Sequence, residues 1–186
     1  MMDDMVELVG RLLVATPAIE SGPFCRSVVF VLDHDADGTL GVIVNRPLLA
    51  DVEDVLPDWA GLVDAPVCLF DGGPVGSDSA LAVGLVTGAV PPAGWRPMAG
   101  RVGLVDLDGP VPAGGALAGL RVFAGYAGWG PGQLDDELAE GAWLVVDADE
   151  RDLVSPRPDS LWRDVLRRQE GDVRFWTTFP DDPSTN

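Results

Sequence analysis

Three short motifs in this sequence carry the side chains best suited to ligand binding, and each follows an apolar run of strand type. They read Asn45-Arg46-Pro47, Gly72-Gly73-Pro74 and Gly-Tyr-Ala-Gly-Trp at residues 125–129. Strand ends that converge on one rim of a sheet form a natural pocket. We therefore predict a candidate ligand-binding set made of Asn45, Arg46, Gly72, Gly73, Tyr126, Trp129 and Gln133.

Within this set, Arg46 is the candidate group for a small anionic ligand, because a guanidinium forms charge-assisted hydrogen bonds with carboxylates and phosphates. Asn45 and Gln133 would supply hydrogen bonds, and Tyr126 and Trp129 would form the walls. A second interpretation assigns the same residues to turns and core packing alone, since glycine is needed wherever the backbone takes a positive φ or approaches another segment. We favour this structural interpretation of the motifs.

The residue types that are missing exclude several kinds of chemistry. All twelve basic residues are arginine, so the chain has no lysine for a Schiff base, a pyridoxal-phosphate anchor or a P-loop. The single histidine, His34, excludes a multi-histidine zinc or iron site. No Gly-x-Ser-x-Gly nucleophile elbow is present. We predict no catalytic residue, no metal and no cofactor, and lean against an enzyme.

One motif imitates a calcium loop. Residues 33–38 read Asp-His-Asp-Ala-Asp-Gly, which matches the first half of a calcium-binding loop. The twelfth position, which should be a bidentate glutamate, is Val44, and strands flank the segment where helices are required. Asp and Gly are also the residues that a hairpin turn requires, so we predict a turn.

The two cysteines are too few for a disulfide framework and are typical of a reducing compartment. Cys68 lies in an apolar run and is expected to be a small core residue. Cys25 precedes Arg26, which could lower the pKa of its thiol. A Cys25–His34 pair is excluded, because nine residues of extended chain separate them by roughly 30 Å.

Charge and hydropathy limit the partners. Thirty acidic and twelve basic residues give a net charge of −18, which opposes contact with nucleic-acid phosphates and with anionic membranes. No apolar run approaches the ~20 residues of a membrane helix, and the first residues show no signal-peptide pattern. We expect a cytoplasmic protein that binds neither nucleic acid nor membrane directly.

The chain as a whole predicts one α+β domain over residues 1–180, followed by a fraying polar tail at 181–186. Helices are expected after Asp51, from Gln133 and after Ser160. Residues 88–100 and 108–119 are expected to be loops. Strands are expected at 11–15, 27–32, 40–44, 67–70, 80–86, 102–107, 121–124, 142–146 and 174–179.

The segment 121–146 shows the sharpest change of pattern. Its glycines predict a loop after a short strand, and Leu134 and Leu138 then lie four residues apart on one helical face. A glycine loop before a helix N-terminus can bind phosphate. Here the glycine spacing is wrong, and Asp135 and Asp136 put carboxylates where the phosphate would sit. We therefore predict a strand, a structural glycine loop, a helix and a strand.

Six segments together resemble the YqgE/AlgH family, in the expected order and over nearly the whole chain. They are residues 12–17 (Leu-Leu-Val-Ala-Thr-Pro), 24–29 (Phe-Cys-Arg-Ser-Val-Val), 41–47 (Gly-Val-Ile-Val-Asn-Arg-Pro), 72–75 (Gly-Gly-Pro-Val), 125–143 and 160–163 (Ser-Leu-Trp-Arg). The resemblance implies a branched, partly barrel-like sheet flanked by helices, in a bacterial cytoplasmic protein. The chain departs from the family pattern at residues 77–80, where Ser-Asp-Ser-Ala replaces a frequent Asp-Arg-Gly-Phe run.

The family has no established activity, although its name derives from a proposed role in transcriptional control. Two functional classes are therefore predicted. The first is a non-catalytic regulatory or adaptor domain that acts through a protein partner, so that any effect on transcription is indirect. The alternative is a small-molecule sensor or metal-independent enzyme that uses the rim pocket around Arg46.

Overall fold

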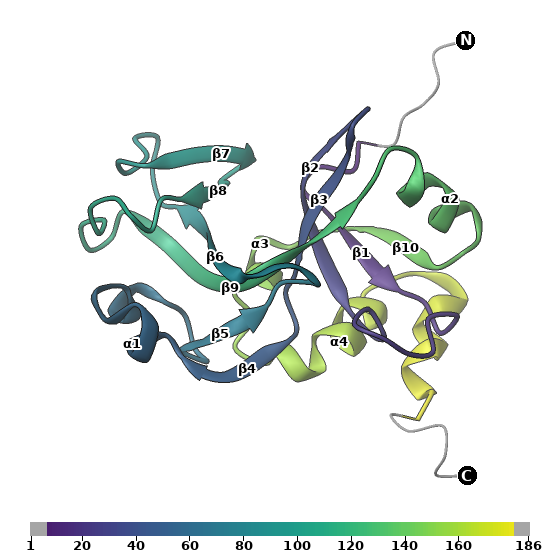
Figure 1. The fold of residues 1–186 in the computed structure, drawn as a ribbon. Helices are drawn as coiled ribbons and strands as arrows, with labels where there is room; N and C mark the ends of the chain where they lie inside the picture. Colours follow the sequence, from purple (N-terminus) through teal and green to yellow (C-terminus); the bar gives the residue numbers. More distant parts are fainter. Residues whose placement is uncertain (1–6, 181–186) are drawn as a thin grey trace.

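The computed structural model describes residues 7–180, so the tail predicted at 181–186 lies outside the described residues. Ten strands form a sheet in the order β10-β1-β2-β3-β9-β6-β8-β7, with β5 branching from β9 and β4 beyond β5. The predicted α+β architecture, a branched and curled sheet flanked by helices, is confirmed (Figure 1). The strands are β1 Arg11–Ala15, β2 Val28–Asp35, β3 Gly38–Ile43, β4 Pro47–Asp51, β5 Cys68–Asp71, β6 Val75–Val86, β7 Trp95–Ala99, β8 Val102–Val105, β9 Leu117–Trp129 and β10 Trp143–Asp147.

Short helices connect and cover these strands. The α-helices are α1 Val52–Val55, α2 Gln133–Ala139, α3 Glu150–Leu153 and α4 Leu161–Arg167, and the 3₁₀ helices are Pro57–Leu62, Pro158–Ser160 and Gly171–Thr178. The predicted helix starts near Asp51, Gln133 and Ser160 are confirmed. Gly141 has φ +76 just after α2, as a helix C-terminal glycine requires.

The long strand β9 joins the two halves of the sheet (Figure 1). Its final residues pair with β3, its earlier residues pair with β6, and β5 joins it in parallel. The register slips between β6 and β9, where Val75 pairs with Tyr126 but Ala80 pairs with Ala124. Such a bulge bends a sheet, and Gly125 lies at this point with φ +72.

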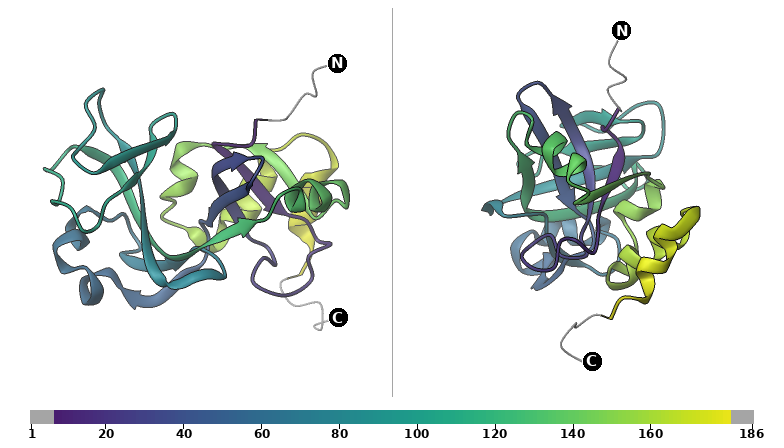
Figure 2. Two further views of the ribbon diagram at one scale, coloured as in Figure 1. Left: turned by 45° about the horizontal axis from the view of Figure 1, so that its top comes forward. Right: turned by 90° about the vertical axis from the view of Figure 1, so that its right-hand side faces the viewer.

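The sheet β10-β1-β2-β3 is buried on both faces, which explains why β1 is almost entirely apolar. Leu12 and Val14 pack in one core cluster with side chains of α4. Leu13 and Ala15 point to the other face and share a second cluster with Leu134 of α2. The two views of Figure 2 show α4 and the following 3₁₀ helix on one side of these strands and α2 on the other.

Several of the predicted elements are wrong in whole or in part. Residues 125–129 were expected to form a loop, but β9 continues through them, because these glycines fit a bulge and close packing within the sheet. Residues 174–179 were expected to form a strand, but they belong largely to the 3₁₀ helix Gly171–Thr178. The predicted loop at 88–100 contains β7, which pairs with β8. The predicted loop at 108–119 ends early, because β9 begins at Leu117 and pairs there with β6.

A buried arginine supports the inner side of β9. The side chain of Arg121 is fully buried, and its guanidinium lies 4.1 Å from the ring centroid of Phe70. Its Nη2 donates to the carbonyl oxygens of Ala65, at 3.2 Å, and Ser155, at 3.3 Å. Burial lowers the pKa of Arg121 to about 10, against the opposing influence of Asp64. Arg121 therefore links β9, the segment before β5 and the segment after α3.

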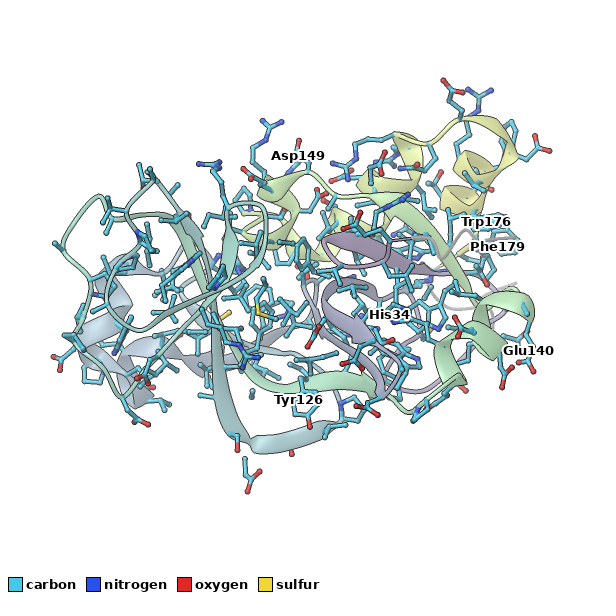
Figure 3. All side chains as sticks on the ribbon, turned by 90° about the horizontal axis from the view of Figure 1, so that it is seen from above. His34, Tyr126, Glu140, Asp149, Trp176 and Phe179 are labelled. Atoms are coloured by element: carbon cyan, nitrogen blue, oxygen red, sulfur yellow. The ribbon has the colours of Figure 1, made fainter. Side chains whose placement is uncertain are left out.

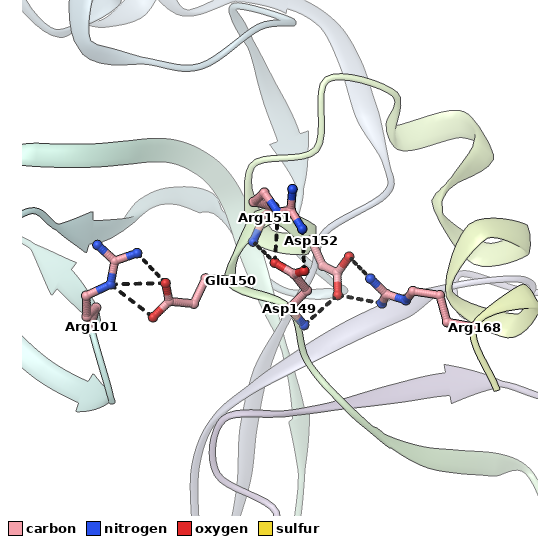
Figure 4. Close-up of polar contacts among 6 residues, drawn as sticks. All are labelled: Arg101, Asp149, Glu150, Arg151, Asp152 and Arg168. Atoms are coloured by element: carbon pink, nitrogen blue, oxygen red, sulfur yellow. Dashed lines mark hydrogen bonds and ion pairs between the residues drawn. The ribbon is translucent and has the colours of Figure 1, made fainter. Parts of the chain in front are cut away.

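The short helix α3 forms a polar junction between the halves of the molecule (Figure 4). On one side Glu150 binds Arg101, which lies between β7 and β8. On the other side the buried carboxylate of Asp152 receives two hydrogen bonds from Arg168 beyond α4, at 2.9 and 2.7 Å. A capping box closes the start of α3, because Asp149 and Asp152 each accept a backbone N–H of the helix N-terminus.

We expect Arg121→Ala to lower the free energy of unfolding by about 3–5 kcal/mol, the range for deleting a large buried side chain. Arg121→Met should cost clearly less, because methionine fills much of the volume without burying a charge. Urea unfolding measures both changes, and the exposed Arg96→Ala serves as a control expected to stay within about 0.5 kcal/mol. Equal stability of Arg121→Ala and the wild type would contradict this role for Arg121.

The cap of α3 predicts an acid-dependent contribution to stability. Hydrogen bonds from the side chain and backbone of Arg151 lower the pKa of Asp149 from 3.8 to about 2. A carboxyl whose pKa is lower in the folded state stabilises the fold above its unfolded pKa, and this contribution is lost as the pH falls through the folded pKa. The relevant window therefore runs from about pH 4 down to about pH 2.

We expect Asp149→Ala to lower the free energy of unfolding by about 1 kcal/mol at neutral pH, through loss of the N-cap. The difference from the wild type should narrow as the pH falls across that window. Asp149→Asn keeps a side-chain acceptor for the cap, so its free energy of unfolding at neutral pH should fall less than that of Asp149→Ala. Chemical unfolding at a series of pH values is the measurement. A stability difference between Asp149→Ala and the wild type that does not change with pH would contradict this role for the Asp149 carboxylate.

Candidate functional site

The structure places Asn45 as a support for a loop. Asn45 is buried just after β3, and its Oδ1 accepts a hydrogen bond from the N–H of Val28 at 2.8 Å. Its Nδ2 donates to the carbonyl oxygen of Arg26 at 2.9 Å. Both ends of the amide therefore bind the backbone at the start of β2, seventeen and nineteen residues earlier in the chain.

Arg46 holds the same loop from its other side. Its guanidinium donates to the carbonyl oxygen of Cys25, and its own carbonyl accepts the N–H of Asp71 at 2.8 Å. Asn45 and Arg46 thus act together on the segment from Cys25 to Val28. The candidate anion-binding group is engaged with the protein backbone in this structure.

The second and third motifs meet through their backbones. The N–H of Gly72 donates to the carbonyl oxygen of Ala124 at 3.0 Å. A Cβ on Gly72 would fall within 3.0 Å of the carbonyl oxygen of Gly125, and one on Gly73 within 3.0 Å of the Tyr126 backbone, distances that real Cβ atoms essentially never show. Gly73 also has φ +144. The two strand ends converge, as predicted. Their main chains are in direct contact at this point.

Tyr126 and Trp129 line an open hollow of about 350 Å³ beside the β2–β3 hairpin. The other walls include Val75 and residues of the hairpin, three of which carry carboxylates: Asp33, Asp35, Asp37, Gly38, Thr39 and Leu40. The negative charge of the hairpin makes this hollow a poor place for an anion. Of the predicted ligand-binding residues, only Tyr126 and Trp129 are among those that line it.

The calcium-like segment lies at the tip of this hairpin, but the turn is shorter than predicted: β2 runs through Asp35 and β3 begins at Gly38, so only Ala36 and Asp37 form the turn. The carboxylate of Asp35 accepts the N–H of Asp37 at 2.8 Å, a local hydrogen bond typical of aspartate in turns. The Nδ1 of His34 lies 2.7 Å from the hydroxyl oxygen of Thr39 on the facing strand. Within residues 7–180, no group of three or more histidine, cysteine or acidic side chains is arranged to hold a metal ion.

Trp129 and Gln133 belong to a network around the carboxylate of Glu137 in α2. The indole N–H groups of Trp129 and Trp143 donate to the same oxygen of Glu137, at 2.9 and 2.7 Å. Gln133 donates to the other oxygen at 3.0 Å and accepts the N–H of Gly130 at 3.1 Å. This network ties the end of β9 to α2 and β10.

A second, more enclosed pocket of about 280 Å³ was not predicted from the sequence. Its walls come from four distant segments: Thr16, Pro17, Ile19, Glu20, Cys25, Arg26, Trp162, Phe179 and Pro180. Figure 3 shows Phe179 beside Trp176 at one end of the molecule and Tyr126 well apart from them, so the two hollows are separate. The available signal was that Thr16, Cys25 and Trp162 lie in motifs that carry the family resemblance.

Arg26 is the unusual residue of this pocket. Its φ is +54, and it is the one non-glycine residue with a positive φ among residues 7–180. Its guanidinium carbon lies 5.2 Å from the centroid of the Trp162 ring, and its Nη2 donates to the carbonyl oxygens of Phe179, at 3.3 Å, and Pro180. Such backbone conformations persist only where the surroundings hold them.

A third surface feature follows the Asn45-Arg46-Pro47 motif along the chain, where Pro47 begins β4. The strand β4 pairs with β5, and no strand pairs with its other edge in the described chain. Four of the nine exposed large apolar side chains of residues 7–180 belong to β4, to α1 or to the residue just before β5: Leu48, Leu49, Val55 and Val67. We call these four residues the β4 patch.

The fold and these sites define a class of protein: a branched α+β sheet whose glycine motifs allow close contact between main chains, with surface hollows and an apolar sheet edge. Within residues 7–180, no helix has the length and apolar character needed to cross a membrane. The AlgH-like family model matches residues 12–174, and the chain belongs to this family.

Similar proteins extend over essentially the whole chain. A UPF0301 protein of Streptomyces coelicolor is 55% identical, with 100% of this chain and 98% of the relative covered. A UPF0301 protein of Rhodococcus jostii is 43% identical over 95% of this chain and 90% of the relative. A crystal structure of a Corynebacterium diphtheriae protein is 33% identical and superimposes with a TM-score of 0.85, covering 92% of each chain. The AlgH protein of Pseudomonas aeruginosa, at 21% identity and a TM-score of 0.68, covers 98% of this chain and 99% of its own and shares the fold.

We expect Gly73→Ala to lower the free energy of unfolding by more than about 3 kcal/mol, because it combines a strained φ with a clash against backbone. The matched control is Gly61→Ala, since a Cβ at Gly61 meets nothing within 4 Å; it should stay within about 0.5 kcal/mol. Urea unfolding followed by circular dichroism gives both values. A Gly73→Ala protein as stable as the control would overturn the structural assignment of this motif.

Proposed function

We propose that this protein is a non-catalytic regulatory or adaptor protein of the cytoplasm that acts through a protein partner. The observation that carries the proposal is the β4 patch, which lies along a sheet edge with no strand beyond it in the described chain. An exposed apolar edge is a template for a further strand, and soluble proteins usually protect such edges with charge or cover them. We therefore assign β4 as the partner-binding edge.

The occupant that suits this edge is an extended segment of the partner, added as a strand. Main-chain hydrogen bonds would then give affinity, while alternate side chains reach the β4 patch and give specificity. Exposed acidic residues border the patch, namely Asp51, Glu53, Asp54 and Asp58, and the chain carries a net charge of −18. Charge complementarity therefore favours an apolar segment flanked by arginine or lysine.

This proposal also limits how the protein could act on transcription. Nucleic-acid affinity depends largely on neutralising phosphates with basic side chains. This chain has thirty acidic residues and only twelve basic ones, so its net negative charge opposes contact with phosphates. A regulatory effect would therefore pass through the bound protein. The absence of a lysine from the chain excludes Schiff-base chemistry on a lysine side chain.

The test uses displayed peptides that alternate apolar and basic residues, selected on the full protein and compared with scrambled versions. Leu49→Asp should weaken the selected peptides at least tenfold, since burying a leucine contributes about 1.5–3 kcal/mol. Val90→Asp is the matched control, because Val90 is equally apolar and well exposed but lies outside the β4 patch. Backbone amide shifts in residues 48–51 should report binding at the edge.

Peptides that bind Leu49→Asp as tightly as the wild type would rule out β4 as the docking edge. Sedimentation of the protein alone tests the other occupant, a second copy of this chain. A wild-type dimer that becomes a monomer in Leu49→Asp would replace the partner proposal with self-association through β4.

A further inference from the structure

We propose that the enclosed pocket of about 280 Å³ beside Trp162 binds a small uncharged apolar molecule, of the size of one ring with a short alkyl chain. Two observations support this ligand class. The polar side chains of the pocket are already bound to other parts of the protein or to water, and one wall is a loop that distant side chains hold in a strained conformation. The pocket is separate from the β4 patch, so the proposal does not depend on the protein partner.

Two polar groups of the pocket are bound to neighbouring main chain. The hydroxyl of Thr16 donates to the carbonyl oxygen of Gly141 at 2.7 Å and accepts the N–H of Ala18 at 3.3 Å. The buried indole of Trp162 donates its N–H to the carbonyl oxygen of Ala15 at 2.8 Å. Both groups therefore have partners without a ligand. The same contacts hold the walls in place, so the pocket is largely preformed, as small-molecule sites usually are.

The other polar side chains of the pocket are engaged or solvated. The thiol of Cys25 donates to the carbonyl oxygen of Glu20 at 3.6 Å, and Glu20 itself is exposed to water. The guanidinium of Arg26 lies over the Trp162 ring and donates to two carbonyl oxygens of the C-terminal segment. A charged group that leaves water without finding a partner is costly to bury. The pocket therefore favours an uncharged ligand.

The loop that forms the wall around Cys25 and Arg26 is held in a strained shape. Arg26 has φ +54, and a left-handed backbone costs energy in residues other than glycine. The amide of Asn45 donates to the carbonyl oxygen of Arg26 and accepts the N–H of Val28. On the other side, Arg46 donates to the carbonyl oxygen of Cys25. Strained backbone of this kind is concentrated at functional sites, which favours a role for this wall in ligand binding.

The volume and the apolar walls set the size of the ligand. A cavity of about 150 Å³ can hold benzene, so the larger volume here accommodates roughly one ring with a three-carbon chain. The apolar walls include Pro17, Ile19, Trp162 and Phe179. Phe179 is 50% exposed and lies beside Trp176 at one end of the molecule (Figure 3). A ligand that covers its ring removes apolar surface from water, which favours binding without any charged contact.

The test compares three molecules of nearly the same shape: propylbenzene, the 2-phenylethylammonium cation and the 3-phenylpropionate anion. Titration of the full protein, followed by NMR, should show propylbenzene binding at least ten times more tightly than either ion, because neither charge would find a partner in the pocket. An ion that binds as tightly as propylbenzene would overturn the proposal. So would the absence of propylbenzene binding up to its solubility limit.

The position of the ligand is measured from the indole N–H resonances of the same titration. Propylbenzene should shift the resonance of Trp162, which lines the pocket. Trp59 is the internal control, because it packs in another core cluster and does not line the pocket. Binding that shifts Trp59 and leaves Trp162 unchanged would place the ligand elsewhere and contradict the proposal.

Ile19→Asp places a charge on the apolar wall and should weaken the binding of propylbenzene at least tenfold. Val111→Asp is the matched control, because Val111 is an exposed apolar residue outside the pocket, and its affinity should equal that of the wild type. Unchanged binding in Ile19→Asp would overturn the proposal. The ligand comparison and the indole shifts use the wild-type protein, so they decide the question even if Ile19→Asp does not fold.

Discussion

Where β5 ends beside β9, the backbone of Gly72 and Gly73 lies against that of Gly125 and Tyr126, closer than any side chain would allow. This contact is also the branch point of the sheet. The N–H of Gly72 binds Ala124 of β9, and its carbonyl oxygen accepts the N–H of Ile43 at the end of β3 at 2.9 Å. One glycine therefore fixes the spacing of three strands, and the course of the chain after β3 follows from that spacing.

The buried side chain of Arg121 in β9 also holds this branch point together from the core side. A guanidinium without a hydrogen-bonded carboxylate is costly to bury, yet Arg121 lies on the ring of Phe70 and reaches carbonyl oxygens from two other segments. The polar contacts of α3 act further out, where Glu150 and Asp152 connect opposite sides of the molecule through Arg101 and Arg168. The two halves of the sheet are thus joined by one strand, one buried cation and one short helix.

Much of the fold could be predicted from local pattern. The strand at 11–15 and the helix from Gln133 follow from apolar runs, periodicity and a terminal glycine. The glycines of residues 125–129 misled the prediction, because the sequence does not distinguish a glycine that breaks a strand from one that admits a neighbouring backbone. At 174–179 the aromatic composition favoured a strand, but β-propensity depends on a neighbouring strand to pair with, and the segment packs beside α4 instead.

The candidate site shows the same limit at the level of single side chains. Asn45 and Arg46 have the functional groups of a ligand-binding pair, but their partners are backbone atoms about twenty residues earlier, which no local pattern reveals. The left-handed φ of Arg26 likewise depends on that distant amide. The motif Asn45-Arg46-Pro47 then has a consistent physical role as a connection. Its first two residues bind the loop that lines the enclosed pocket, and its third residue begins β4. The segment around the motif is fixed by backbone hydrogen bonds from Asp71 to Arg46 and from Ile43 to Gly72. One short segment therefore connects the pocket wall to the exposed sheet edge.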